Sequence, residues 1–202
     1  MSRDGPVDPE KRATLRQFAA LGAVGPLARF VEEREDDGDT RGAIAGYVAT
    51  TPGAHFSKIR DDLKLGTGET QHHLKALEDA GAVESRRDGD YRRFFPADQF
   101  SPFEQVALGY LRRETPRGML LALLSNPDLS GSALASHLDV SGATVSTYAA
   151  DLEEAGLLAR EDGYAPRRPE TLITLIVRYA NSFDAVTAEF ADRADQLVTY
   201  DP

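Results

Sequence analysis

The sequence predicts an α+β protein that is mainly α-helical and carries small β-hairpins. Two segments of the chain resemble one another at a constant offset, which indicates an internal duplication. In both segments a helical pattern ends at a glycine and is followed by an Asp-Gly dipeptide, which favours a hairpin turn. Helical periodicity also precedes the first segment and follows the second. We therefore expect two copies of one small domain, with additional helices at both ends of the chain.

The duplicated segments are SKIRDDLKLGTGETQHHLKALEDAGAV at residues 57–83 and SALASHLDVSGATVSTYAADLEEAGLL at residues 132–158. The aligned positions that agree best are small or apolar: Leu63 with Leu138, Leu77 with Leu152, Ala80 with Ala155, and Gly81 with Gly156. A solenoid needs roughly three or more repeats, so two copies predict two tandem domains.

Each copy contains the same order of elements. A first helix ends before a proline, a short second helix follows, and a glycine-containing turn leads to a third helix. The expected helices span 41–50, 57–63 and 68–80 in the first copy, and 117–125, 132–138 and 143–155 in the second. Hairpin turns are expected at Asp88-Gly89 and Asp162-Gly163. Three helices followed by a β-hairpin make a winged helix-turn-helix domain, so we expect two such domains in tandem.

The flanking segments complete the expected division of the chain. EEREDDGDT, residues 32–40, reads as an acidic linker after an N-terminal helix at about 9–33, and FSPFEQVALGYLRRET, residues 100–115, predicts a helix between the two copies. The expected segments are an N-terminal helix and acidic linker at 1–39, the first winged helix at 40–96, a connecting helix at 97–114, the second winged helix at 115–168 and a C-terminal helix at 169–202.

The composition limits the function classes that remain. The chain of 202 residues has no cysteine, which excludes disulfides, thiolate zinc sites and a cysteine nucleophile. No nucleophile–base pair, phosphate-binding loop or carboxylate constellation is visible, so we expect neither an enzyme nor a cofactor. The start of the chain has no signal sequence, and the apolar stretch at residues 17–28 is shorter than the roughly 20 residues of a membrane span. We expect a cytoplasmic protein that does not cross a membrane.

The charge is distributed unevenly along the chain. The net charge is -10, and the excess of aspartate with few lysines resembles cytoplasmic proteins of salt-loving archaea. In concentrated salt the Debye length falls to about 3 Å or less, so the total charge says little about whether one face binds a phosphate backbone. Residues 40–96 hold nine basic and eight acidic residues, and they are the only segment that is not acidic.

GETQHHLKALEDAGAV, residues 68–83, resembles the third helix and the start of the wing in winged-helix regulators of the ArsR and MarR type. The arrangement over about residues 9–168 resembles the tandem winged helix-turn-helix transcriptional regulators of halophilic archaea. The resemblance implies a transcription regulator that binds double-stranded DNA as a homodimer. Winged helices also serve as protein–protein modules, and an interaction module without sequence-specific DNA binding is the alternative.

The third helix of the first copy has two different faces. At 100° per residue, Leu74 and Leu77 share one face with His73 at its edge, whereas His72 points outward, so the two histidines are not expected to hold a metal. The outward side chains suit a major groove, because Gln can pair with adenine and His or Lys can donate to guanine or phosphate. The expected DNA contacts on this helix are Thr67, Glu69, Gln71, His72 and Lys75. An ordinary solvated helix face is the alternative.

The first hairpin, ESRRDGDYRRFF at residues 84–95, is rich in arginine. Arginine in a wing can hold phosphates or enter a minor groove. The expected contacts are Arg86, Arg87, Arg92 and Arg93, together with Lys58 on the preceding helix. Salt bridges within the hairpin, to Glu84, Asp88 and Asp90, are the alternative use of these arginines.

The second copy lacks these cations. Its third helix presents Ser146, Thr147, Ala150 and Glu154 outward, and its wing carries only Arg160 before the turn. Residues 115–168 hold four basic and seven acidic residues. We expect Ser146, Thr147 and Arg160 to form a weaker DNA contact or a docking surface for a protein partner.

The segment after Pro169 carries a heptad-like stripe on one expected helix. The stripe consists of Leu172, Ile176, Tyr179, Phe183, Val186 and Phe190. We expect this helix to pair with a second subunit and form the homodimer, and packing against its own chain is the alternative.

Overall fold

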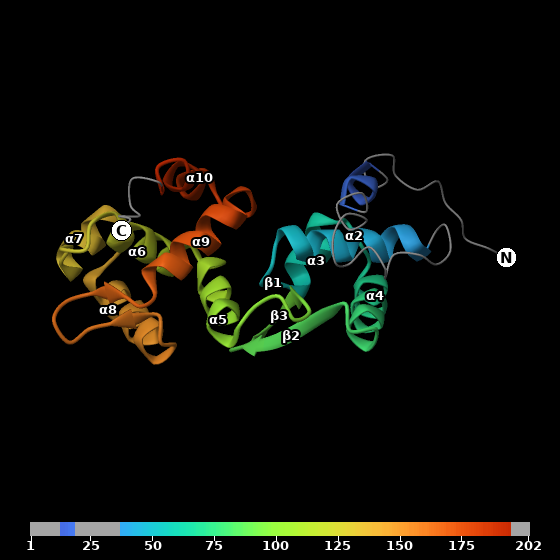
Figure 1. The fold of residues 1–202 in the computed structure, drawn as a ribbon, viewed down its shortest axis with the longest axis horizontal. Coiled ribbons are helices and arrows are strands. Elements are labelled where there is room, and N and C mark those ends of the chain that lie inside the picture. The colour runs from blue at the N-terminus through green and yellow to red at the C-terminus, as the bar shows by residue number, and fades with distance from the viewer. Residues whose placement is uncertain (1–12, 19–36, 195–202) are drawn as a thin grey trace, which may run out of the picture. The chain divides into compact units, whose positions relative to one another are not determined.

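The computed structural model describes residues 13–18 and 37–194. The chain divides into two compact units, residues 1–101 and 102–202. Helices dominate both units, and each unit contains a small antiparallel sheet (Figure 1). The predicted α+β class with two winged helix-turn-helix domains is confirmed. Among the described residues, no helix is long and apolar enough to cross a membrane.

The first unit packs helices against a three-stranded sheet. Its elements are α2 (Asp37–Thr50), β1 (Ala54–His55), α3 (Phe56–Asp62), α4 (Thr67–Asp79), β2 (Val83–Asp88) and β3 (Tyr91–Pro96). The strand order is β1-β3-β2 with antiparallel pairs, so β3 is the central strand. The helices α3 and α4 form the helix-turn-helix, and the β2–β3 hairpin forms the wing. The two-residue strand β1 has no counterpart among the sequence predictions.

Local sequence determines where α4 and the wing begin and end. The hydroxyl of Thr70 donates to the carbonyl of Gly66 at 2.9 Å and ties the first turn of α4 together. Beyond α4, Gly81 has a φ of 69°, which a residue without Cβ adopts at no steric cost. The wing turns between Asp88 and Tyr91, which are paired across the strands, and Gly89 in the turn has a φ of 59°.

The core of the first unit joins all of its helices to the sheet. Buried apolar side chains come from α2, α3, α4 and β3 and from the turn after α3, and they include Ile44, Ile59, Leu63, Leu77 and Phe94. Helical residues 13–18 add Leu15 to this core, and the ring of Phe18 lies 5.2 Å from the ring of Tyr47. The rest of the N-terminal helix expected at about 9–33 lies outside the described residues.

The second unit repeats the helix-turn-helix pattern between additional helices. Its elements are α5 (Pro102–Leu111), α6 (Glu114–Ser125), α7 (Gly131–His137), α8 (Gly142–Glu154), β4 (Leu158–Ala159), β5 (Ala165–Pro166), α9 (Pro169–Tyr179), the 3₁₀ turn η2 (Ala180–Ser182) and α10 (Ala185–Ala191). Its wing strands are only two residues long, and Pro166 has no amide hydrogen with which to extend the ladder. The helix expected between the two copies appears as α5, which belongs to this unit and packs against α6 and α9.

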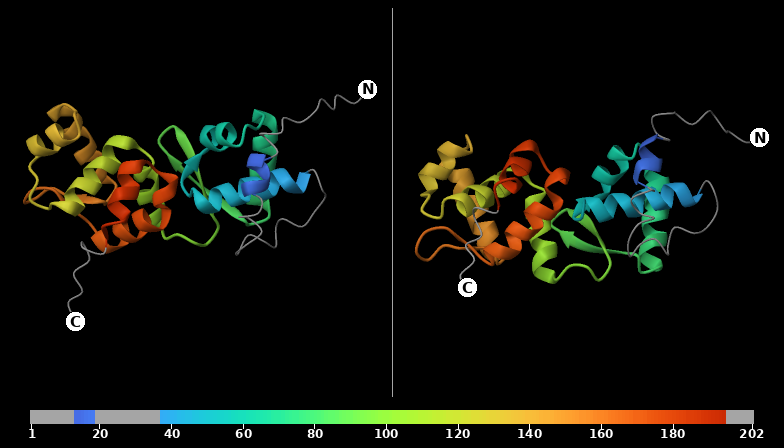
Figure 2. Two further views of the ribbon diagram at one scale, coloured as in Figure 1. Left: turned by 90° about the horizontal axis from the view of Figure 1, so that it is seen from above. Right: turned by 45° about the horizontal axis from the view of Figure 1, so that its top comes forward.

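The prediction of one continuous C-terminal helix is wrong. The helix stops at Tyr179, passes through η2 and restarts at Ala185, so α10 folds back beside α9 (Figure 2). Asp184 caps α10, because its carboxylate accepts hydrogen bonds from the amide of Thr187 at 2.9 Å and from the Thr187 hydroxyl at 2.6 Å. Asp184 and Thr187 have the spacing of an N-cap pair, so this local signal marks the start of α10.

Two arginines hold this corner in place. Arg112 donates to the carbonyl of Ser182 at 2.7 Å, and its guanidinium lies 4.2 Å from the centroid of the Phe183 ring. Arg117 donates to the carboxylate of Asp184 and to the carbonyl of Leu111 at 2.8 Å. Contacts that reach across the unit therefore fix the break between α9 and α10.

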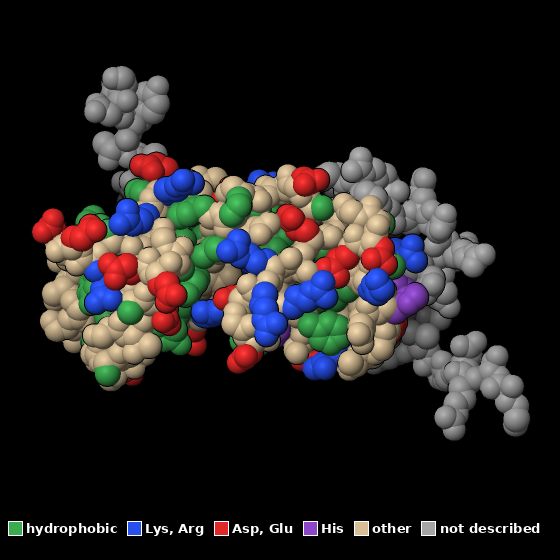
Figure 3. All heavy atoms as spheres, turned by 90° about the horizontal axis from the view of Figure 1, so that it is seen from below, with side chains coloured by type: hydrophobic (Ala, Val, Ile, Leu, Met, Phe, Trp, Pro, Cys, Tyr) green, Lys and Arg blue, Asp and Glu red, His purple; other side chains and the backbone are tan. Residues whose placement is uncertain are grey.

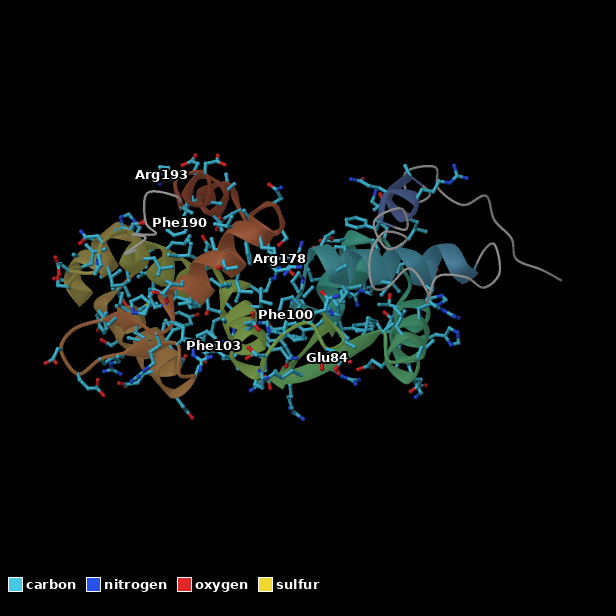
Figure 4. All side chains as sticks on the ribbon, viewed as in Figure 1. Glu84, Phe100, Phe103, Arg178, Phe190 and Arg193 are labelled. Carbon is cyan, nitrogen blue, oxygen red and sulfur yellow. The ribbon has the colours of Figure 1, made fainter. Side chains whose placement is uncertain are left out.

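Most of the expected dimerisation stripe is used inside the second unit. Leu172, Ile176, Tyr179 and Phe190 are buried, Phe183 is half-buried, and only Val186 is largely exposed, at 65%. Phe190 turns toward the body of the unit and Arg193 points outward (Figure 4). The stripe follows the expected spacing because α9 and α10 both pack inward, which is the alternative that the sequence left open. The predicted subunit contact through these residues is therefore corrected.

Candidate nucleic-acid interface

The helix α4 divides its side chains between core and surface. Leu74 and Leu77 are buried, and His73 is only 3% exposed, which confirms its predicted place at the core edge. His72 is exposed, and its ring lies 5.1 Å from the ring of His73. The described part of the chain holds no group of three or more His, Asp or Glu side chains arranged for a metal. The exposed side chains of α4 include Thr67, Gln71, His72, Lys75 and Asp79.

An open groove of about 590 Å³ lies between α4, α3 and the central strand of the sheet. Its floor is apolar, because Phe56 of α3, Leu74 of α4 and Phe94 of β3 line it. Polar side chains complete the lining: Thr67, Gln71, Lys75, Glu78, Asp79 and Arg92. Figure 3 shows Lys and Arg side chains gathered around a hydrophobic patch on one face of the first unit. The groove therefore combines a predicted groove-reading helix with one strand of the wing.

The register of the wing separates its arginines into two pairs. Arg87 lies opposite Arg92, and Arg86 lies opposite Arg93. Residues directly opposite one another share a face of the sheet, so the two pairs point to opposite faces. Arg92 is the member that lines the groove. Arg87 and Arg92 therefore lie on the α4 side of the wing, and Arg86 and Arg93 lie on the reverse side.

Arg92 is fixed between the wing and α4. Its Nε donates to the hydroxyl of Ser85 at 2.7 Å, and its Nη2 donates to Glu78 Oε1 at 2.7 Å. The Ser85 hydroxyl itself donates to Glu78 Oε1 at 2.6 Å, which closes the network. The side chain of Arg92 remains 61% exposed, so this cation is held in place while it still meets solvent. Arg87 is exposed as well, and its Nε donates to the carbonyl of Gly89 at 3.3 Å.

Arg93 is not the DNA contact that the sequence predicted. Its side chain is only 4% exposed, and it forms an ion pair with Asp88 and donates to the carbonyl of Gly53 at 2.9 Å. Its guanidinium also lies 5.6 Å from the centroid of the Tyr91 ring. Arg93 is buried because it lies on the central strand β3, which directs this side chain toward the segment before β1. Arg93 therefore joins the wing to the body of the unit.

Glu69 is also corrected, because it caps α4 instead of projecting toward a ligand. Its Oε2 accepts a hydrogen bond from the amide of Gly66 at 3.2 Å, and its Oε1 accepts one from the hydroxyl of Thr40 at 3.5 Å. A carboxylate three residues after the N-cap satisfies an amide that the helix leaves unpaired. This side chain is half-buried and belongs to the start of the helix.

The remaining predicted lysines are exposed and paired within their helices. Lys58 on α3 contacts Asp62 at 2.8 Å, and Asp62 also accepts the Tyr47 hydroxyl at 2.5 Å. Lys75 on α4 contacts Asp79 at 2.9 Å. Both pairs have the helical i,i+4 spacing, for which each contribution to stability is about 0.3–0.5 kcal/mol. Such weak pairs leave both lysines able to turn toward a phosphate.

His55, on the reverse side of the sheet with Arg93, is a structural residue that the sequence did not reveal. Its Nδ1 accepts the amide of Lys58 at 3.3 Å and caps α3, and its ring lies 4.9 Å from the ring of Tyr91. Burial lowers the pKa of His55, and the charges of Arg93 and Lys58 lower it further. A neutral imidazole keeps one nitrogen as an acceptor, which this cap requires.

The second winged helix presents a different surface. On α8, Ser146 and Thr147 are exposed, but the Thr147 hydroxyl donates to the carbonyl of Ala143 in its own helix at 3.0 Å. Arg160 after β4 pairs with Glu153 at 3.4 Å. The exposed side of α8 carries no lysine or arginine. The two copies thus share a fold and differ in the charge of the face that corresponds to α4.

Comparison with known proteins agrees with this arrangement. Residues 38–108 match a family described as an N-terminal HTH domain, and residues 115–169 match the MarR family. The chain is a tandem winged helix-turn-helix protein. It is 29% identical over 159 residues to a protein of Methanocaldococcus jannaschii described as an uncharacterized HTH-type transcriptional regulator. The match covers 76% of the chain and 40% of the relative, so the chain spans about two fifths of the relative's length.

Proposed function

We propose that the tandem winged helix-turn-helix protein is a DNA-binding transcription regulator in which α4 enters a major groove. One observation carries the proposal: the exposed face of α4 and the exposed Arg92 of the wing line the same groove of the first unit. A helix and a hairpin that share one face can contact bases and backbone together.

The side chains of α4 match the chemistry of base edges. Gln71 can form a bidentate pair with adenine, and His72 can donate to guanine or to a phosphate. An α-helix with its side chains is about 10–12 Å wide, which suits a major groove about 12 Å wide. Thr67 lies in the first turn of α4, the part of a recognition helix that contacts base edges.

The wing supplies contacts that do not depend on sequence. Arg87 and Arg92 share the face of the sheet that adjoins α4, and both are exposed. Guanidinium groups bind phosphate oxygens through paired hydrogen bonds and fix the orientation of a protein on the duplex. Lys58 on α3 adds a third cation, and Arg86 on the reverse face of the wing extends the contact along the backbone. The relative described as a transcriptional regulator supports a regulatory role for this DNA binding.

Selection from a pool of random DNA duplexes tests the proposal. The protein is expected to enrich a defined motif, and a palindromic motif would indicate that a homodimer binds it. Gln71→Ala is expected to relax one position of the motif by about 1–3 kcal/mol of discrimination, which sequencing of the enriched pool measures. Recovery of the pool without enrichment of any motif would contradict sequence-specific binding.

A paired substitution separates the backbone contact from base reading. Arg87→Ala is expected to weaken binding to all duplexes alike, measured by fluorescence anisotropy at matched salt. Arg193→Ala, in the turn after α10, removes an exposed arginine outside the proposed face and is the control. Equal affinities for wild type and Arg87→Ala would remove the wing from the interface.

A second candidate concerns the second winged helix, for which we propose docking of a protein partner. Its exposed α8 face has no cation, the hydroxyl of Thr147 is used within its helix, and Arg160 is paired with Glu153. Arg160→Ala is therefore expected to leave DNA affinity within a factor of about two, because a lost phosphate contact costs more than that near physiological salt. A loss as large as that of Arg87→Ala would place the second winged helix on DNA.

A further inference from the structure

The two cations that line the groove each have a carboxylate partner that lines it too. Lys75 Nζ lies 2.9 Å from Asp79 Oδ2 and 3.1 Å from Asp79 Oδ1. Arg92 Nη2 lies 2.7 Å from Glu78 Oε1. Each of the two cations that line the groove therefore already has one negative charge beside it.

The two pairs differ in strength but have the same consequence. Lys75 and Asp79 are 73% and 65% exposed, so a phosphate can displace this weak pair, yet the Asp79 charge stays on the face. Glu78 is only 19% exposed and also accepts the Ser85 hydroxyl, so the carboxylate stays beside Arg92. In both cases a phosphate that approaches the cation also approaches a carboxylate.

This geometry opposes the usual source of salt dependence. When free cations of a protein neutralise phosphates, DNA releases condensed counterions, and the slope of log K against log salt is about -0.9 per phosphate contact. A carboxylate left beside a bound phosphate repels it and must be compensated by a cation from solution. Uptake of that cation offsets the release of another, so the slope becomes shallower.

We infer that Glu78 and Asp79 are built-in counterions of the DNA face that set the response of DNA binding to salt. The inference rests on the proposed function of the same groove. It assigns to these two carboxylates the role of lowering affinity at low salt while preserving it as salt rises. The first winged helix can then hold DNA over a wider range of ionic strength than its cations alone would allow.

Isosteric amides test this role with little change of shape. Glu78→Gln keeps an oxygen that can accept from Ser85 and Arg92, and Asp79→Asn keeps one that can accept from Lys75. Glu189→Gln on α10 raises the net charge of the chain by the same amount as either single variant and is the matched control. The measurement is fluorescence anisotropy of a labelled mixed-sequence duplex in potassium chloride between about 50 and 200 mM, the range over which release is commonly followed.

The double variant is expected to bind more tightly at the lowest salt and to lose affinity faster. Each freed cation adds about 0.9 to the magnitude of the slope, so the double variant should lose about tenfold more affinity than wild type across this range. Asp79→Asn alone, at an exposed position, should steepen the slope by about half as much, which keeps the test independent of any effect of Glu78→Gln on folding.

Two results would overturn the inference. Equal slopes for wild type and both amide variants would show that the carboxylates take no part in the salt response. An equal change of the slope in Glu189→Gln would show that the net charge of the chain causes the effect, and that the positions of Glu78 and Asp79 do not. Binding with unchanged slopes refutes only this inference, whereas failure of wild type and variants to bind any duplex refutes the proposed function as well.

Discussion

Replacing Arg93 with methionine should destabilise the wing while leaving the proposed DNA face intact. Methionine keeps much of the aliphatic volume and removes the ion pair with Asp88 and the hydrogen bond to the carbonyl of Gly53. The arginine side chain is 4% exposed, so both interactions are made almost out of contact with water.

The magnitude follows from the burial of the two partners. Removing one member of a buried ion pair costs about 3–5 kcal/mol, because the other charge remains without compensation. Asp88 is 20% exposed, so water can reach its carboxylate and the lower end of that range applies. We therefore expect a loss of about 3 kcal/mol in the free energy of unfolding of the first unit.

Hydrogen exchange of the full chain measures this loss at its location. Amides of the β2–β3 ladder should exchange about a hundredfold faster in Arg93→Met, since each 1.4 kcal/mol corresponds to about a tenfold change. Arg87→Ala on the same hairpin is the matched control and should leave this protection unchanged. Unchanged protection in Arg93→Met, or weaker DNA binding by that variant with full stability, would refute the structural role of Arg93.

Three further predictions concern local structure. Glu69→Ala removes the α4 cap and should lower the free energy of unfolding by about 1 kcal/mol, measured by urea titration. DNA affinity should not change. Weaker DNA binding by a fully stable Glu69→Ala variant would return Glu69 to the interface. Gly118→Ala should cost up to about 1 kcal/mol, because a Cβ there would lie 2.7 Å from Leu138 Cδ2, and the displacement of this half-buried side chain outweighs the gain in helix propensity. Gly142→Ala, where a Cβ would meet nothing within 4 Å, is its control, and equal melting temperatures of the two variants would contradict the packing argument. The pKa of His55 is lower in the folded protein than its ordinary value of 6.5, so the neutral imidazole stabilises the fold. This contribution is fully present above the unfolded pKa and is lost as pH falls through the folded pKa. His55→Asn should therefore flatten this part of the curve of stability against pH. A parallel decline in wild type and His55→Asn would contradict that assignment.

The helices of both copies could be predicted because several local signals agree. Apolar periodicity, a glycine after the third helix and a proline after the first all mark the same boundaries, and α4 begins and ends within a residue of its expected place. Outward and inward faces followed from the same periodicity, which is why His72 and His73 were separated correctly.

The roles of the wing arginines required tertiary information. The tight turn fixes Arg86 opposite Arg93 and Arg87 opposite Arg92, and this pairing is readable from the sequence. Which pair faces the body depends on β1, a two-residue strand with no periodicity of its own. The burial of Arg93 therefore depends on the contact between β3 and the segment around β1, which no local sequence pattern predicts.

The prediction of one continuous C-terminal helix was wrong for a different reason. A stripe with heptad spacing has the same appearance on one helix that meets a partner and on two helices that pack on their own unit. The choice depended on Arg112 and Arg117, which lie far away in the sequence and hold the corner at Phe183 and Asp184. Long-range contacts decided between the two interpretations.

Directed cleavage of bound DNA tests most directly whether α4 faces the duplex. The chain has no cysteine, so His72→Cys and Val186→Cys each provide a single attachment point for an iron chelate that cuts nearby DNA. Both positions are exposed, the first on α4 and the second on α10. Strong cutting is expected from position 72 over a short run of nucleotides, and little cutting is expected from position 186. Equal cutting from both positions, or none from position 72 on DNA that the protein binds, would contradict the placement of α4 against the duplex.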